Sequence, residues 1–306
     1  MASADPDARQ RYTTWRQLDP VLIKAVGILT DRDRRLLAAL NMHRVLTTEQ
    51  AMQLFFRNPT TTQHRLLSLE RYRLLARFRP WRPVGTAQSH WTLDIPGLLV
   101  VEASRAESRR EDETPDTLLR RMKQRRLWLD QLPHGPHLTH RVETTSFFTR
   151  LIWDARTHTD GRQLLAWWNE RRLANELHSY LIDSIRPDGY GAWNQDGRTV
   201  EFFLEYDRGT EPLSRLRDKI LAYPEAVTWI GRPVAVLFAV PSQGRLANLK
   251  SAIWPVADCC GISVAGAVIG SSSPNRVVWS TGSGLSNCQL SEVPVAAIGP
   301  DTTTDS

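Results

Sequence analysis

An Asp-Gly dipeptide constrains this chain more than any other feature of its sequence. Asp196-Gly197 lies between two runs of strand length that are rich in apolar and aromatic residues, a pattern typical of a β-hairpin with a two-residue loop. If these two residues form the loop, Gln195 pairs with Arg198 across the hairpin. Counting back along both strands then places Asp188 directly opposite Glu205, because paired strands keep one register.

The pairing of Asp188 with Glu205 brings two carboxylates together on one face of the sheet. Side chains directly opposite in an antiparallel pair have Cβ atoms about 5 Å apart, and like charges there destabilise the sheet unless something compensates. Mg²⁺ prefers oxygen ligands and keeps several waters, so two carboxylates can hold it. We therefore predict a site for Mg²⁺, or for Mn²⁺, at this pair. The alternative is a solvated network with neighbouring arginines, which would have little energetic value.

Helical and strand patterns surround this hairpin and predict a core of order α-β-β-β-α-β. The expected elements are a helix at 140–156, a strand or helix at 163–173 with the strand favoured, hairpin strands at 186–194 and 198–207, a helix at 210–223 and a strand at 233–240. The last of these is a continuous apolar run, which is typical of a strand buried on both faces.

The first third of the chain has the pattern of three helices followed by a hairpin. Helices are expected at 31–40, 48–56 and 60–72, and strands at 74–78 and 90–94. Thr30 can cap the first helix, and Thr47 with Gln50 forms a capping-box pattern for the second. This order indicates a winged helix-turn-helix, in which the third helix enters the major groove and the wing follows the DNA backbone.

Basic residues gather where such a domain would touch DNA. Between Thr62 and Pro83 there are six arginines and one acidic residue, Glu70. Arginine and small polar side chains are the types that contact phosphates and base edges. The candidate DNA-binding residues are Thr61, Gln63, His64, Arg65, Arg71, Arg73, Arg77, Arg79 and Arg82. The alternative is a small helical adaptor with a solvated basic face.

The whole chain has a net charge of +6, and only four of its 39 basic residues are lysine. This composition suits an anionic partner, since the arginine fork matches phosphate, although a GC-rich genome produces the same bias. The sequence has a polar N-terminus and no apolar run long enough for a membrane span. We therefore expect a cytoplasmic protein with no membrane partner.

A length of 306 residues suits two domains, each with its own core. We expect an α+β protein whose two domains are joined by a helical connector. The predicted parts are an N-terminal arm at 1–26, a winged helix DNA-binding domain at 27–96, a helical connector at 97–136, an α/β domain at 137–270 and a partly disordered C-terminal extension at 271–306.

Two known families share parts of this pattern. The α-β-β-β-α-β order, with Pro187-Asp188 entering one hairpin strand and Glu205 on the next, resembles the core of the PD-(D/E)xK nuclease superfamily. The most specific segment is Phe203–Glu211, FLEYDRGTE. Together with the N-terminal winged helix, this segment is similar to the replication-relaxation family of bacterial plasmids and integrative conjugative elements, over residues 27–270.

The nuclease resemblance implies roles for individual residues. Asp188 and Glu205 would bind the metal and, with a lysine two positions after the second acid, carry the catalysis. Asp207 stands at the place of that lysine. Either Lys219 on the following helix replaces it, or Asp207 helps to hold a second metal ion. Glu143, on the first helix of the domain, would be an accessory acid.

These resemblances imply a DNA-binding protein of a plasmid or integrative conjugative element that acts in DNA relaxation, replication or transfer as a Mg²⁺-dependent nickase. The expected partner is double-stranded DNA at the origin of the element, with a second copy of the chain or other transfer and replication proteins. The missing lysine supports the alternative, a catalytically inactive nuclease-like protein that binds DNA in an accessory or regulatory role.

Overall fold

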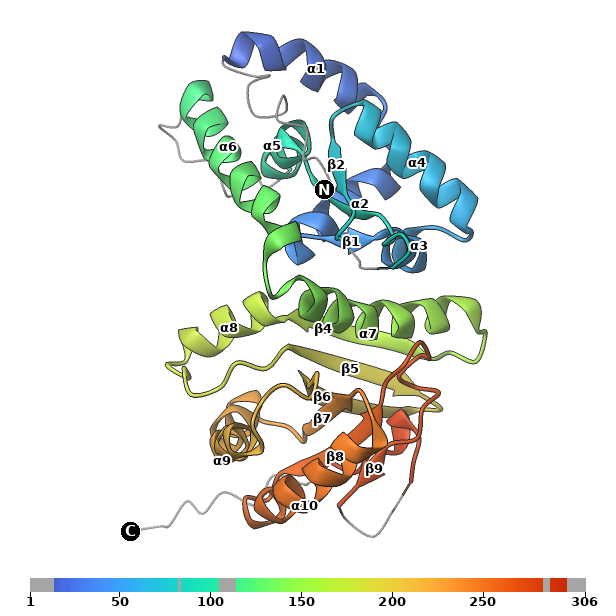
Figure 1. Ribbon diagram of the computed structural model, residues 1–306, viewed down its shortest axis with the longest axis vertical. Helices are drawn as coiled ribbons and strands as arrows, with labels where there is room; N and C mark the ends of the chain where they lie inside the picture. Colours follow the sequence, from blue (N-terminus) through green and yellow to red (C-terminus); the bar gives the residue numbers. More distant parts are fainter. Residues whose placement is uncertain (1–13, 82–83, 105–113, 283–286, 296–306) are drawn as a thin grey trace. The chain divides into compact units, whose positions relative to one another are not determined.

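The computed structural model describes residues 14–81, 84–104, 114–282 and 287–295 (Figure 1). The chain is a mixed α+β protein with two sheets, as the sequence predicts. It divides into two compact units, Met1–Thr145 and Ser146–Ser306, each described here by itself. None of the helices in the described ranges is long and apolar enough to cross a membrane.

The first unit combines helices with a small antiparallel sheet of order β1-β3-β2. Its elements are α1 Trp15–Gly27, α2 Asp31–His43, β1 Leu46–Thr47, α3 Thr48–Phe55, α4 Pro59–Arg71, β2 Leu75–Phe78, β3 His90–Leu93, α5 Ile95–Ala103 and α6 Pro115–Gln131. The three predicted helices and the predicted hairpin are therefore present in the expected order.

Local capping explains where these helices begin. The hydroxyl of Thr30 accepts a hydrogen bond from the Asp33 amide at the start of α2. The Thr47 hydroxyl and the Gln50 side chain form the predicted capping box at the start of α3. Asn58 caps α4 by accepting from the Thr61 amide. Each cap satisfies an amide that has no partner within its helix, so the boundaries follow from local sequence.

Two predictions about this part of the chain are wrong. The expected arm at 1–26 contains α1, which buries Leu18 and Ala25 in the core of the first unit. The expected connector contains α5 and α6, which belong to the same core. α5 is apolar on nearly every side and buried throughout Ile95–Val101, and α6 buries one face, with Leu119, Met122 and Leu129. The charged stretch at 105–113 lies outside the described residues.

The second unit is built on a six-stranded sheet of order β4-β5-β6-β7-β8-β9. Its elements are α7 Leu138–Thr157, which begins in the first unit, β4 Gln163–Asn169, α8 Glu170–Ser179, β5 Gly189–Gln195, β6 Arg198–Tyr206, α9 Leu213–Ile230, β7 Ala235–Val240, α10 Gln243–Cys259, β8 Ser263–Val268 and β9 Ser280–Thr281. β6, β7 and β8 are parallel, and the other neighbouring pairs are antiparallel.

The predicted hairpin register is confirmed. Gln195 pairs with Arg198, and the pairing continues without a shift to Gly189 opposite Leu204. Asp196 and Gly197 both have positive φ, 53° and 73°, which is the backbone of the turn that Asp-Gly favours.

The stretch at 163–173 is divided between two elements. It continues the strand expected there as far as Asn169, whose side chain accepts from the Arg172 amide and begins α8. The sequence favours a strand at 163–173 because of its pair of aromatic residues, but it does not exclude a helix. The structure contains both, one after the other.

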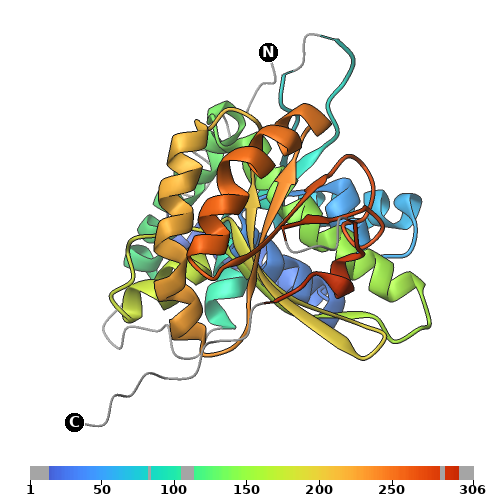
Figure 2. The ribbon, with the colours of Figure 1, turned by 90° about the horizontal axis from the view of Figure 1, so that it is seen from below.

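The two faces of the large sheet have different covers. Phe203, Val236 and Phe238 point to the face covered by α9 and α10, which lie side by side in Figure 2. Their neighbours Phe202 and Leu237 point to the opposite face, where they pack with the α7 residues Phe147, Phe148 and Leu151. Because successive residues of a strand alternate between faces, Glu205 shares the α9 face with Phe203.

The C-terminal segment after 270 is part of this core, in contrast to the expected extension. β9 pairs with β8, and Trp279 and Leu290 are fully buried on the α7 side of the sheet. Residues 296–306, including the tail expected to be disordered, lie outside the described residues. The apolar side chains in this segment are widely spaced, so local periodicity does not reveal their burial.

Candidate functional site

Asp188 and Glu205 come together at the end of the β5–β6 hairpin. Gly189 pairs with Leu204, so the residues one step further along, Asp188 and Glu205, follow as neighbours. The Asp188 amide donates to the Leu204 carbonyl at 2.9 Å, and Oδ2 of Asp188 accepts from the Tyr206 amide at 2.7 Å. The Asp188 carboxylate is thus fixed over the end of β6, close enough for its charge to act on Glu205.

Helix α9 supplies two side chains that hold Glu205. Lys219 Nζ lies 3.0 Å from Oε2 of Glu205, and the Tyr223 hydroxyl donates to Oε1 at 2.6 Å. These residues are one helical turn apart and therefore project from the same face of α9. Lys219 Nζ also lies 3.4 Å from Oε2 of Glu211. Lys219, which was predicted to replace the missing lysine, thus contacts Glu205 of the acid pair, and its catalytic role stays a prediction.

Burial sets the electrostatics of this cluster. Glu205 is 3% exposed, and burial together with the charge of Asp188 raises the pKa of Glu205 to about 7, although Lys219 and Tyr223 act in the opposite direction. Burial disfavours the charge of Lys219, but the carboxylates of Glu205 and Glu211 outweigh it and raise the pKa of Lys219. Burial raises the pKa of Tyr223 as well, so its hydroxyl stays a donor. The site therefore holds a protonated lysine beside two acids.

Asp207 does not add a third carboxylate to this site. Its Oδ1 accepts from the Gly209 amide at 2.7 Å, and its Oδ2 accepts from Arg245 Nε at 2.5 Å. Arg245 also donates to the Glu211 carbonyl at 2.6 Å. In the described part of the chain no three acidic, histidine or cysteine side chains are arranged to hold a metal ion. Arg245 already neutralises Asp207 in this arrangement, and the metal role expected of Asp207 stays a prediction.

The accessory role expected of Glu143 gains no support. The α7 residues that belong to the second unit, among them Phe147 and Phe148, pack on the sheet face opposite to that of Glu205. Glu143 precedes them on this helix, in the part assigned to the first unit.

The predicted DNA-binding residues of the first unit fall into two groups. Thr61, Gln63, His64 and Arg71 are exposed on α4, and Arg77 and Arg79 are exposed on β2 and just after it. Arg73 is half-buried and lies two residues after the end of α4, with a positive φ of 59°. Arg82 lies outside the described residues. The exposed members lie on α4 and on or just after β2, where Arg77 also pairs with Glu70 at 3.4 Å.

Arg65, expected to be available on the outside of α4, is instead half-buried and bound to groups of the same unit. Its guanidinium donates through Nε to Oδ1 of Asp33 at 2.9 Å and through Nη2 to the Ile28 carbonyl at 2.8 Å. The Asp33 side chain is completely buried. Burial alone would raise the pKa of Asp33, but hydrogen bonds from Arg65 and Thr30 lower it. Arg65 therefore neutralises a buried acid between α4 and α2.

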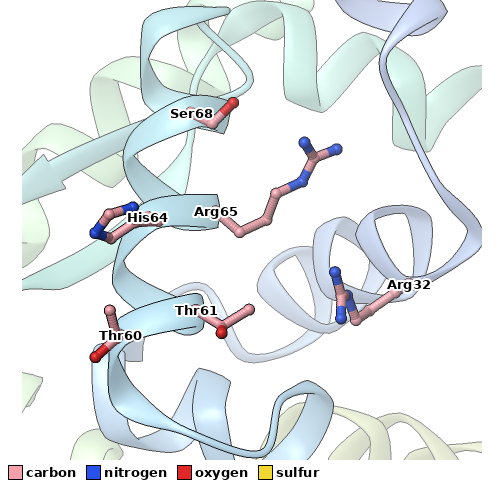
Figure 3. Close-up of a pocket in the computed structure, with 6 residues that line it drawn as sticks. All are labelled: Arg32, Thr60, Thr61, His64, Arg65 and Ser68. Carbon is pink, nitrogen blue, oxygen red and sulfur yellow. The ribbon is translucent and has the colours of Figure 1, made fainter.

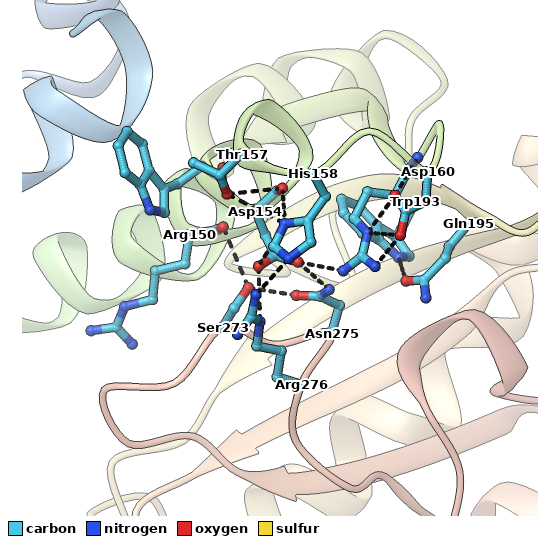
Figure 4. Close-up of polar contacts among 12 residues, drawn as sticks. Arg150, Asp154, Thr157, His158, Asp160, Trp193, Gln195, Ser273, Asn275 and Arg276 are labelled. Atoms are coloured by element: carbon cyan, nitrogen blue, oxygen red, sulfur yellow. Dashed lines mark hydrogen bonds and ion pairs between the residues drawn. The ribbon is translucent and has the colours of Figure 1, made fainter. Parts of the chain in front are cut away.

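A second buried acid, Asp154, organises polar contacts between α7 and the C-terminal segment (Figure 4). It accepts from Arg162 Nη1 at 2.7 Å and from Arg276 Nε at 2.9 Å, and it also binds the side-chain amide of Asn275. Burial opposes the charge of Asp154, but these donors lower its pKa. The network holds the segment around residue 275 against the end of α7, which is a structural role.

Sequence reasoning missed Tyr223, which binds Glu205, and Arg245, which binds the neighbouring Asp207. Tyr223 carried a usable signal, since it follows Lys219 by one helical turn on a predicted helix. Arg245 carried none, because α10 reaches Asp207 only through the packing of the sheet.

One comparison with known proteins found a match. The family described as replication-relaxation matches residues 37–233, which include α4, the hairpin with Asp188 and Glu205, and α9 with Lys219. The chain has no match among the curated proteins or among the solved structures. Since the matched segment covers more than half of the sequence, the chain belongs to the replication-relaxation family.

Proposed function

We propose that this protein binds double-stranded DNA of a plasmid or integrative conjugative element through a winged helix in its first unit and nicks it at a PD-(D/E)xK-like site in its second. The observation that carries the proposal is the position of Lys219, whose Nζ lies 3.0 Å from Glu205 beside Asp188. Two acids and a lysine from a following helix reproduce the residue types that the usual sequence pattern would supply from two strands.

The donor set suits a divalent cation. Asp188 and Glu205 would hold Mg²⁺ or Mn²⁺, since two carboxylates suffice for an ion that keeps several waters. When bound, the metal makes a better nucleophile of water and offsets negative charge on the phosphate. Lys219 keeps its proton beside Glu205 and Glu211, so it supplies positive charge to the phosphate and does not act as a general base.

The first unit supports the DNA-binding part of the proposal. The helices α2, α3 and α4 are followed by the β2–β3 hairpin. The last of these helices, α4, exposes Thr61, Gln63, His64 and Arg71. The hairpin strand β2 adds Arg77. Small polar side chains on a helix and arginines along a hairpin are the arrangement that a winged helix uses on DNA.

A nicking assay tests the catalytic part. Supercoiled DNA carrying the origin of the element is incubated with the protein and Mg²⁺ or Mn²⁺, beside Asp188→Asn, Glu205→Gln and Lys219→Met. We expect nicked circles from the original protein and none from the variants, with DNA binding retained by all four. Nicking that survives in Glu205→Gln would overturn the assignment of the site.

A second candidate function has its own support. Both oxygens of Glu205 are engaged by Lys219 and Tyr223, and the usual lysine position holds Asp207 paired to Arg245. A nuclease-like unit fixed in this way suits a DNA-binding accessory protein without catalysis. Origin DNA that is bound equally by all four proteins and nicked by none would support this role.

The expected association with a second copy of the chain stays a prediction, and sedimentation of the free protein tests it.

A further inference from the structure

A hollow lined by α2 and α4 includes Thr61 and His64 of the proposed DNA-binding helix, but its α2 side has no role in the proposals above. It has a volume of about 420 Å³ and is lined by Arg32, Thr60, Thr61, His64, Arg65 and Ser68 (Figure 3). We refer to it as the α2–α4 hollow. Its lining consists of hydroxyl, imidazole and guanidinium groups and contains no carboxylate. These groups donate hydrogen bonds, so the hollow suits an anion with several acceptor oxygens.

The two arginines of the hollow differ in what they already bind. Arg65 is neutralised by Asp33 and also donates to the Ile28 carbonyl. Arg32 lies with its guanidinium carbon 4.5 Å from the centre of the Phe56 ring. Nε of Arg32 is buried and has no hydrogen-bond partner in the described parts of the chain. A ligand cannot reach the buried Nε, so an anion would contact the Nη groups of Arg32. Arg32 has no ion pair in the described parts of the chain, so its charge, unlike that of Arg65, is not already neutralised.

The packing of Arg32 favours a planar, pre-oriented donor group. A guanidinium stacked on an aromatic ring loses little further freedom when it binds, and its fork matches two oxygens of a phosphate. Phe56 is 2% exposed and so provides a fixed platform. Thr61, from the first turn of α4, faces the same hollow (Figure 3). Hydroxyl and arginine donors of this kind are those that position proteins on nucleic acid backbones.

We propose that the α2–α4 hollow binds a phosphate group, with Arg32 as its cation and the hydroxyl of Thr61 as a second donor. The inference rests on the proposed function in one respect. If the protein binds DNA through α4, the phosphate in the hollow belongs to the DNA backbone that lies beside the exposed face of α4. In this proposal the charged contact with the phosphate comes from Arg32 on α2, because Arg65 on α4 is already paired with Asp33. Free phosphate offers the same chemistry, and the test separates the two sources.

The first arm of the test measures the affinity for duplex DNA of the origin as a function of salt. Arg32→Met keeps an unbranched side chain on Phe56 and removes the charge. Arg34→Met is the matched control, because Arg34 is an exposed arginine of α2 that does not line the hollow. We expect Arg32→Met to weaken binding about tenfold and to reduce the slope of log affinity against log salt by about 1. We expect Arg34→Met to change neither.

A third variant separates charge from geometry. Arg32→Lys keeps the charge without the planar fork, so the salt slope should persist while the affinity falls. Unfolding curves of all variants show whether each is folded before it is compared. Equal binding by Arg32→Met and the original protein, or equal losses in Arg32→Met and Arg34→Met, would overturn the assignment of the hollow to a DNA phosphate while leaving DNA binding itself intact.

The second arm uses inorganic phosphate and needs no DNA. We expect phosphate to shift the NMR signals of the Thr61 amide and the His64 ring in the original protein and not in Arg32→Met. If these shifts occur but Arg32→Met binds DNA normally, the hollow takes free phosphate and the DNA source is wrong. If the original protein fails to bind DNA, the proposed function fails, and the phosphate shifts still decide the site. Absence of the shifts together with an unchanged salt slope rejects the site.

Discussion

The hydroxyl of Tyr223 donates a hydrogen bond of 2.6 Å to Oε1 of Glu205, and both groups are buried. Lys219, one turn earlier on α9, lies against the other oxygen of the same carboxylate. The two contacts stabilise the ionised form of Glu205 against the effect of burial and of Asp188. A carboxylate that burial would otherwise keep protonated is in this way kept available near neutral pH.

Removing the Tyr223 hydroxyl should destabilise the protein. In Tyr223→Phe the ring stays in place, but Glu205 loses a buried donor, so the free energy of unfolding at pH 8 should fall by about 1–3 kcal/mol. Urea denaturation measures the change. Tyr180→Phe is the control, since Tyr180 is 59% exposed and its replacement should change stability by less than about 0.5 kcal/mol. Equal effects of the two substitutions would contradict the role of the hydroxyl.

The stability of the protein should depend on pH through Glu205. Its pKa is about 7 in the folded chain against an ordinary value of 4.5, so between these values the folded state binds more protons than the unfolded state. The contribution of Glu205 is fully present below pH 4.5 and is lost as the pH rises to about 7, by roughly 3 kcal/mol. Urea midpoints at pH 5 and pH 8 should differ less in Glu205→Gln than in the original protein. An unchanged difference would argue against the raised pKa.

Binding of Mg²⁺ should weaken on acidification. Protons compete with the metal for Glu205, so below about pH 7 the affinity should fall by up to about tenfold for each unit of pH. Titration calorimetry at pH 6, 7 and 8 measures this dependence. In Tyr223→Phe the loss of the hydroxyl raises the pKa of Glu205, and the curve should move to higher pH. A flat affinity between pH 6 and pH 8 would show that Glu205 is not a ligand.

Arg65 should matter for stability through Asp33. In Arg65→Met the completely buried Asp33 carboxylate loses its cation, and the free energy of unfolding should fall by about 3–5 kcal/mol. The double variant Asp33→Leu with Arg65→Met removes both charges and should recover most of this loss. Arg71→Met, an exposed change on the same helix, should have little effect. A double variant as unstable as the single one would contradict an ion-pair explanation.

Gly97 should not tolerate a side chain. A Cβ at this position of α5 would lie 2.1 Å from the Leu74 carbonyl oxygen, and a backbone atom cannot rotate away. We expect Gly97→Ala to reduce the free energy of unfolding by at least about 2 kcal/mol. Gly27→Ala is the control, since nothing lies within 4 Å of its added Cβ. Thermal unfolding of both variants measures the difference, and equal melting temperatures would show that α5 shifts without cost.

Local signals in the sequence determined the hairpin and the helix starts. The Asp-Gly turn fixed the register by itself, because a two-residue loop leaves only one pairing for the strands on either side. That register is why Asp188 and Glu205 could be placed together. Thr30 and Thr47 likewise fixed the starts of α2 and α3, since a cap needs only residues within one turn of it.

Only the tertiary structure decided what the charged side chains bind. From the sequence, Arg65 could have faced DNA and Asp207 could have joined the acid pair. In the structure Arg65 pairs with Asp33, and Asp207 pairs with Arg245. Their partners are 32 and 38 residues away in sequence. Periodicity reports which face of an element is apolar, whereas an ion pair depends on which elements pack together. The sequence alone therefore placed Asp188 beside Glu205, through the register of the hairpin. The packing of α9 and α10 decided that Lys219 pairs with Glu205 and that Arg245 pairs with Asp207.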